Sequence, residues 1–131
     1  MSMLDTYRNN LLRKREEAAK LNQDLAKEQA KIAPLQQKII SANAAIGRTK
    51  SASTIKSKLN EIERANKAIA DTQKKVGDIQ KKLAQKEKEI AAAEKTYHSE
   101  ETKVNKKAAD AEKKRIQEAN RQSAALEQAI H

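Results

Sequence analysis

A large apolar residue returns at almost every seventh position of the chain, and this repeat limits the fold more than any other feature. Residues seven apart lie on one face of a helix, about two turns apart. The repeat therefore predicts two long helices, each with an apolar stripe. The two columns of the repeat are Leu4, Leu11, Ala18, Leu25, Ile32, Ile39 and Ile46, then Ile55, Ile62, Ile69, Val76, Leu83, Ile90, Tyr97, Val104 and Ala111.

The segment GRTKSAST, residues 47–54, separates the two columns with small, polar or basic residues. Because two helices joined by a short connection become antiparallel neighbours, we interpret the segment as the tip of a helical hairpin. Gly47 suits a helix C-terminus with positive φ, and Ser51 and Ser53 are candidate N-caps. An anion held at this helix start by Arg48 and Lys50 is an alternative. A nucleotide-binding loop is rejected, since no Gly precedes Lys50 and no strand precedes the segment.

Folding the chain between residues 50 and 51 pairs positions whose numbers sum to 101. Leu11 then meets Ile90, and the large residues of both columns face each other. A second column of the first helix consists of Tyr7, Lys14, Leu21, Glu28, Leu35 and Ala42. The same rule brings Ala42 to Leu59 and Lys14 to Glu87. It leaves polar layers at Asn66 and Gln80, which can fix the register of two helices.

The predicted fold class is all-α, an antiparallel helical hairpin (coiled coil) with a longer second helix. Residues 1–97 form the hairpin, and Pro34 bends its first helix. Residues 98–131 form a helical extension towards a missing C-terminal domain, either continuing the second helix or starting a new one at Ser99. The extension has its own apolar residues, Ile116, Ala119, Ser123, Leu126 and Ile130, in a new phase. Because nothing in the hairpin covers them, we expect self-association into a dimer or larger bundle.

The residue types argue against chemistry in this chain. Cysteine is absent, and the two histidines, His98 and His131, are isolated in the sequence, so no metal site is predicted. Asp and Glu stand beside Lys, as on solvated helix faces; examples four residues apart are Glu63/Lys67, Asp71/Lys75, Asp78/Lys82 and Asp110/Lys114. We therefore predict no catalytic, cofactor-binding or metal-binding residues and no enzyme. The absence of Cys and of a signal sequence leads us to expect a cytoplasmic protein.

A row of lysines supports a rival function. The formal net charge is +10, and the second helix carries Lys67, Lys74, Lys81, Lys88 and Lys95 at seven-residue spacing. Such a row could follow a nucleic-acid backbone or an anionic membrane. Aromatic residues for base stacking make up only 2% of the chain, which weakens this interpretation. The candidate anion contacts are Arg48, Lys50, Lys74, Lys81 and Lys88.

The segment SASTIKSKLNEIER, residues 51–64, resembles the helical N-terminal regions of bacterial TIR-domain proteins. In that family a Ser-x-Ser-Thr-(Ile/Leu)-Lys-x-Lys-Leu run precedes a long coiled coil that leads into the TIR domain. The TIR domains cleave NAD through a glutamate of an α/β domain that has no counterpart here. The resemblance implies that this chain is the regulatory and oligomerising part of a larger protein, broken off in mid-pattern at its C-terminus.

The leading hypothesis is therefore an oligomerisation and scaffolding module that brings attached effector domains together. Its predicted interface residues are those of the apolar columns: Leu4, Leu11, Leu25, Ile32, Ile39, Ile46, Ile55, Ile62, Ile69, Val76, Leu83, Ile90, Tyr97 and Val104. The polyanion-binding rod is the alternative.

Overall fold

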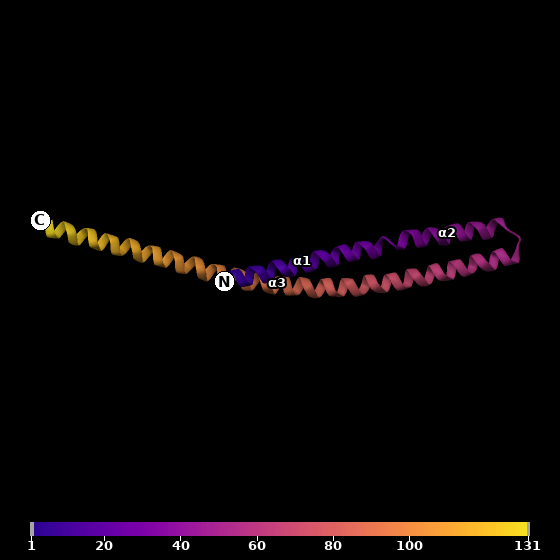
Figure 1. Ribbon diagram of the computed structural model, residues 1–131, viewed down its shortest axis with the longest axis horizontal. Helices are drawn as coiled ribbons and strands as arrows, with labels where there is room; N and C mark the ends of the chain where they lie inside the picture. Colours follow the sequence, from indigo (N-terminus) through magenta and orange to yellow (C-terminus); the bar gives the residue numbers. More distant parts are fainter. Residues whose placement is uncertain (1, 131) are drawn as a thin grey trace. The chain divides into compact units, whose positions relative to one another are not determined.

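The computed structural model describes residues 2–130, and all of its secondary structure there is helical (Figure 1). Helix α1 spans Met3–Gln29, α2 spans Ile32–Arg48 and α3 spans Ala52–Ile130. The predicted all-α class and the longer second helix are confirmed, since α3 has 79 residues against 27 and 17 in α1 and α2. The alternative of a separate helix starting at Ser99 is wrong, because α3 continues through that residue.

Pro34 accounts for the interruption between α1 and α2. A proline ring clashes with the carbonyl four residues earlier and supplies no amide hydrogen. The residue four before Pro34 is Ala30, and Ala30 and Lys31 are the two residues that are not helical. The chain crosses the gap with a tighter turn, in which the Lys31 amide donates to the Glu28 carbonyl at 3.1 Å. The bend expected from the sequence is therefore a two-residue break.

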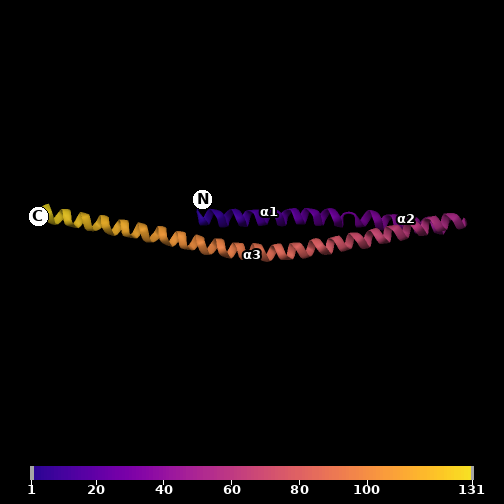
Figure 2. The same cartoon turned by 60° about the horizontal axis from the view of Figure 1, so that its bottom comes forward.

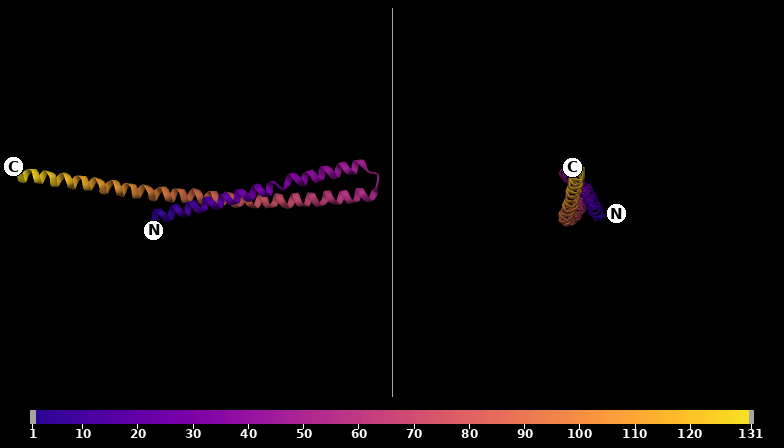
Figure 3. Two further views of the ribbon diagram at one scale, coloured as in Figure 1. Left: turned by 45° about the horizontal axis from the view of Figure 1, so that its top comes forward. Right: turned by 90° about the vertical axis from the view of Figure 1, so that its left-hand side faces the viewer.

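The connection between α2 and α3 has three residues, Thr49 to Ser51, at the right-hand end of the left panel of Figure 3. Thr49 is extended, with φ −115° and ψ 152°. Ser51 caps α3, because its Oγ accepts a hydrogen bond from the Thr54 amide at 3.3 Å. Ser53 lies inside the first turn of α3. The expectation for Gly47 was wrong: it lies inside α2 and its φ is not positive.

The chain divides into two units, and residues 14–89 form the larger one. Within it, α2 and the first part of α3 lie side by side and run in opposite directions (Figures 1 and 2). Two ion pairs link the rest of the first arm to α3, from Lys14 to Glu89 and from Glu17 to Lys86. This unit is an antiparallel helical hairpin, as the sequence predicted.

The first arm of this hairpin buries the positions that the sequence indicated. Buried or half-buried residues recur there at alternating steps of three and four, and they coincide with both predicted columns. Within the unit they are Lys14, Ala18, Leu21, Leu25, Glu28, Ile32, Leu35, Ile39, Ala42 and Ile46, with Asp24, Ala45 and Thr49 beside them. In the first arm, the seven-residue repeat therefore identified the buried face.

On α3 only one of the two expected columns was right. Ile55, Ile62, Ile69, Val76 and Leu83 are buried or half-buried, but Leu59, Asn66, Gln80 and Glu87 are exposed. The second column lies one residue earlier, at Lys58, Ala65, Thr72, Ile79 and Lys86. Positions 58 and 59 both fit an alternation of three and four with Ile55 and Ile62, so the spacing does not decide between them. The structure buries Lys58 in part and exposes Leu59, although Leu59 is the more apolar residue.

The pairing between the arms differs accordingly. Lys14 binds Glu89 in place of Glu87, and Glu17 binds Lys86. The numbers of each ion pair sum to 103 and not to the expected 101, so the pairing between the arms differs from the predicted one. The expected polar layers at Asn66 and Gln80 are absent from the described hairpin.

The second unit comprises the start of α1 up to Arg13 and α3 from Ile90 onwards. Leu11 and Ala93 are buried in it, with 4% and 8% exposure, and Leu4, Tyr7, Ile90 and Tyr97 are half-buried. The Oγ of Ser2 accepts a hydrogen bond from the Asp5 amide at 3.1 Å and so caps α1. Every residue of α3 from Thr102 to Ile130 is exposed.

Candidate functional site

An exposed apolar stripe lies on the part of α3 that no described segment covers, residues 102–130, which we call the extension. Its large members are Ile116, Leu126 and Ile130, with 48%, 64% and 74% of their surface exposed. Val104 is 40% exposed and lies outside the stripe, in the direction of positions 90, 93, 97 and 100. Val104 was predicted to belong to the hairpin seam, but the structure leaves it uncovered. The remaining predicted interface residues, from Leu4 to Tyr97, are buried or half-buried within their own units.

The stripe does not prolong the face of α3 that packs against the start of α1 in the second unit. With about 100° of rotation per residue, positions 90, 93, 97 and 100 cluster around one direction. Positions 116, 119, 123, 126 and 130 cluster around a direction roughly 80° away on an ideal helix. The extension therefore presents its apolar residues on a face of its own.

Charged side chains on the extension fall into two groups. Arg115 Nη2 lies 2.6 Å from Glu112 Oε1, and Arg121 Nη2 lies 2.8 Å from Glu118 Oε1. The hydrogen bond from Arg115 lowers the pKa of Glu112, and the same bond raises the pKa of Arg115. Other charged residues, among them Lys113 and Glu127, have no ion-pair partner within residues 2–130.

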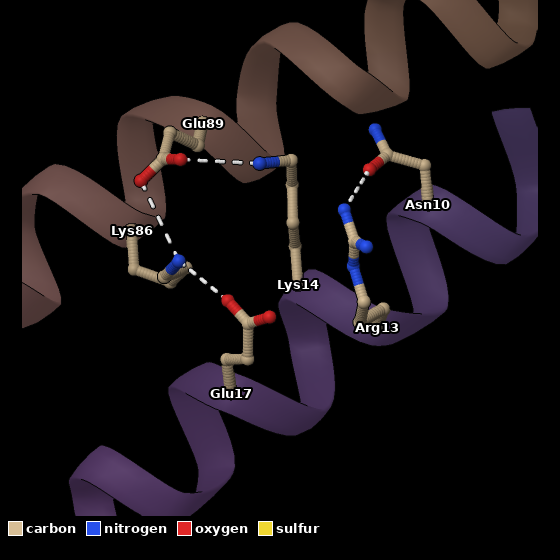
Figure 4. A network of polar contacts seen from close by, with 6 residues as sticks. All are labelled: Asn10, Arg13, Lys14, Glu17, Lys86 and Glu89. Atoms are coloured by element: carbon tan, nitrogen blue, oxygen red, sulfur yellow. Dashed lines mark hydrogen bonds and ion pairs between the residues drawn. The ribbon is translucent and has the colours of Figure 1, made fainter.

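A polar cluster crosses the hairpin between α1 and α3 (Figure 4). Lys14 Nζ lies 3.1 Å from Glu89 Oε1, while Lys86 Nζ lies 2.6 Å from Glu17 Oε2 and 3.6 Å from Glu89 Oε2. The hydrogen bond from Lys14 is the main cause that lowers the pKa of Glu89, and the bond to Glu17 raises the pKa of Lys86. Lys14 and Lys86 occupy seam positions, so their alkyl chains lie across the seam while their ammonium groups reach the carboxylates. The cluster joins the two arms of the hairpin.

Glu28 is another charged residue of the seam. One of its oxygens, Oε1, accepts a hydrogen bond from Lys31 at 2.8 Å, which lowers its pKa. The other, Oε2, is buried without a hydrogen-bond partner among the described residues. In the smaller unit, a hydrogen bond to Tyr97 is the main cause that raises the pKa of Arg8. Tyr97 also lies against His98, with ring centroids 5.5 Å apart.

Two open grooves follow the hairpin. One has a volume of about 770 Å³ and lies beside the helix break, along Pro34, Ser41 and Arg64; its Lys58 is paired with Glu61 at 3.3 Å. The other, of about 630 Å³, lies beside the polar cluster of Figure 4. Across the described residues, no group of three or more His, Asp or Glu side chains could hold a metal ion.

The candidate anion contacts do not converge on one site. Arg48 ends α2, Lys50 lies in the connection, and Lys74, Lys81 and Lys88 are exposed along α3. None of the five has an ion-pair partner in the described part of the chain. The acid–base pairs expected four residues apart, such as Asp110 with Lys114, do not form ion pairs among residues 2–130, where most pairs are three apart. Exposed ion pairs contribute little to stability, so an exposed charged side chain that stays in water loses little by leaving its partner unpaired.

No family model, curated protein or solved structure matches the chain. None of the described helices is both long and apolar enough to cross a membrane. The cytoplasmic localisation stays a prediction.

Proposed function

We propose that this chain is a self-association module whose interface is the apolar stripe of the extension. The observation that supports this is the exposure of Ile116, Leu126 and Ile130 on the extension, where every residue from 102 to 130 is exposed. A single helix in water gains little from its own hydrogen bonds, and helices in proteins depend on packing of an apolar face. A second copy would pack against the apolar face of the extension and cover it, in a dimer or a larger bundle.

In this proposal the hairpin is a rigid arm and the extension joins copies together. Joining two chains raises the local concentration of whatever domains they carry, with no chemistry in the module itself. The resemblance of residues 51–64 to the regions that precede bacterial TIR domains leads us to propose a TIR-type, NAD-cleaving effector as the attached domain. Assembly of the module would then control how often two effectors meet.

Sedimentation velocity on the purified chain tests the proposal. We expect dimers or larger species at micromolar concentration, and Leu126→Asp to abolish them, because association would bury an unpaired charge. Gln128→Asp, on the opposite side of the same turn, should leave association intact. Circular dichroism should be unchanged by Gln128→Asp, and Leu126→Asp should lose at most the helical signal of the extension, since neither residue packs within the chain. A monomeric chain at high micromolar concentration contradicts the proposal.

The lysine row gives a second candidate function, a rod that binds polyanions. Its five members, Lys67, Lys74, Lys81, Lys88 and Lys95, are all exposed, and none is paired with an acidic group within residues 2–130. Binding through the row predicts an affinity for duplex DNA or anionic vesicles that falls steeply with added salt. Changing three members of the row, Lys74, Lys81 and Lys88, to Glu should remove this binding. The same change at Lys103, Lys106 and Lys107 is the matched control, and an equal loss in both variants would contradict a dedicated role for the row.

A further inference from the structure

The charges beside the apolar stripe decide how two copies would pair. Taking Ile116, Ser123 and Ile130 as a positions and Ala119 and Leu126 as d positions, the flanking e positions are Lys113, Asn120 and Glu127. Lys113 and Glu127 carry opposite charges and have no ion-pair partner in the described chain. These two residues are therefore free to pair with another chain.

We infer that two copies of the extension pair in antiparallel orientation, about an axis near residue 121. This inference rests on the proposed function. In antiparallel packing, a positions meet d positions and e positions meet e positions. Ile116 of one copy then packs on Leu126 of the other, and Ala119 on Ser123. Both of these layers occur twice because of the twofold symmetry.

The same alignment brings Lys113 of each copy opposite Glu127 of the other, again twice. Asn120 meets its own counterpart near the axis, where two side-chain amides can donate to and accept from each other. Glu112 lies at the edge of the stripe and faces Ile130 of the other copy. Its carboxylate reaches solvent past Ile130 and keeps its ion pair with Arg115. Every charge near the interface is thus paired or solvated.

Parallel pairing is less favourable for the same residues. It places like positions together, so Glu112 would face Glu112 of the second copy and Ser123 would face Ser123. The flanking contacts would join g to e positions, such as Arg115 to Asn120, and would leave Lys113 and Glu127 without partners. Like charges brought together at an interface oppose association, which supports the antiparallel choice.

The antiparallel contact is short. An overlap of about 19 residues gives an interface roughly 28 Å long. Such an interface belongs to the weak class of protein contacts, which bury little surface. The structure therefore points to reversible association that depends on concentration.

Disulfide trapping tests the orientation, and the native chain contains no cysteine to interfere. Asn120→Cys should form a dimer under mild oxidation, because position 120 lies near its own counterpart. A mixture of Lys113→Cys and Glu127→Cys should give a mixed dimer in greater yield than either variant alone. Ile116→Cys reports parallel pairing, and Lys114→Cys on the outer face is the control. Dimers from Ile116→Cys and none from Asn120→Cys would overturn the antiparallel inference.

Charge reversal supplies an independent measurement by sedimentation velocity. Lys113→Glu should weaken self-association by about tenfold, because two attractive pairs become repulsive. Adding Glu127→Lys to that variant should restore the original affinity, as the charges are then merely exchanged. Association without this rescue overturns the antiparallel pairing but leaves the proposed function standing. A native chain that remains monomeric contradicts the proposed function itself.

Discussion

Two leucines of α3 allow the hairpin register to be tested with one type of substitution. Leu83 lies in the seam and is 7% exposed, whereas Leu59 lies outside it and is 53% exposed. The sequence alone favoured Leu59 as a seam residue facing Ala42. We expect Leu83→Ala to destabilise the hairpin much more than Leu59→Ala.

The magnitude follows from burial. Fully burying a leucine side chain stabilises a protein by about 1.5–3 kcal/mol, and truncation to alanine adds the cost of the space left behind. The seam of two helices is open at its sides and can close partly around the gap. We therefore expect a loss of about 2–3 kcal/mol for Leu83→Ala and less than about 1 kcal/mol for Leu59→Ala. Both changes replace Leu by Ala within a helix, so the propensity difference cancels between them.

Urea denaturation followed by circular dichroism measures both losses. Because self-association makes the apparent stability depend on concentration, each variant is measured over roughly a tenfold range of concentration and compared at equal values. Equal losses for the two variants would refute the register seen here, since Leu59 would then be as buried as Leu83. A larger loss for Leu59→Ala would support the pairing by numbers that sum to 101.

Three further predictions concern single positions. Ser51→Ala should lower the free energy of unfolding by about 1 kcal/mol, because it removes the cap of α3, while Ser53→Ala should have little effect; equal effects in urea denaturation would contradict the cap. Gly77→Ala should raise the free energy of unfolding by about 1 kcal/mol, since its added Cβ meets nothing within 4 Å and its φ is not positive; a lower thermal midpoint would count against this. Lys14 lowers the pKa of Glu89 in the folded state, so this carboxylate stabilises the hairpin above its usual pKa, and the stabilisation is lost as the pH falls through the lowered value. Glu89→Gln should therefore reduce the loss of stability below about pH 5 in a urea series, and an unchanged pH profile would refute this role.

The sequence predicted the buried face of the first arm because its columns keep to one phase. Ile32, Ile39 and Ile46 after the break at Ala30 and Lys31 continue the column of Leu11 and Leu25 before it. A break of two residues did not change which face is buried, since the turn at Lys31 is close to helical, with φ −76° and ψ −21°. Repetition at seven residues was sufficient for this arm.

The register of α3 could not be predicted in the same way. Lys58 and Lys86 are polar, and only their long alkyl chains make them suitable for a seam. Leu59 is the more apolar residue by type, so a choice based on side-chain chemistry selects the wrong neighbour. The alternation of three and four residues fits either neighbour, so it could not correct that choice. The two ion pairs made by Lys14 and Glu17 follow from that register and were missed with it.

Part of the candidate interface could be predicted from the sequence. Leu126 and Ile130 stand out in the sequence as apolar residues with no counterpart in the first arm. Val104 was assigned to the hairpin because it continues the column of Tyr97 by seven residues. A repeat shows which face a residue occupies but does not show where the opposing helix ends, and that end exposes Val104.

The break at Ala30 and Lys31 also affects how the hairpin opens. Helical order spreads cooperatively along a continuous helix, and an interruption stops the spread. An opening that starts at the tip can unwind α2, which has only 17 residues, and stop there while α1 stays folded. Fraying that starts at the N-terminal end of α1 likewise stops at the break and does not reach α2. Hydrogen exchange should accordingly divide the first arm into two blocks with separate protection, while α3 has no internal boundary of this kind.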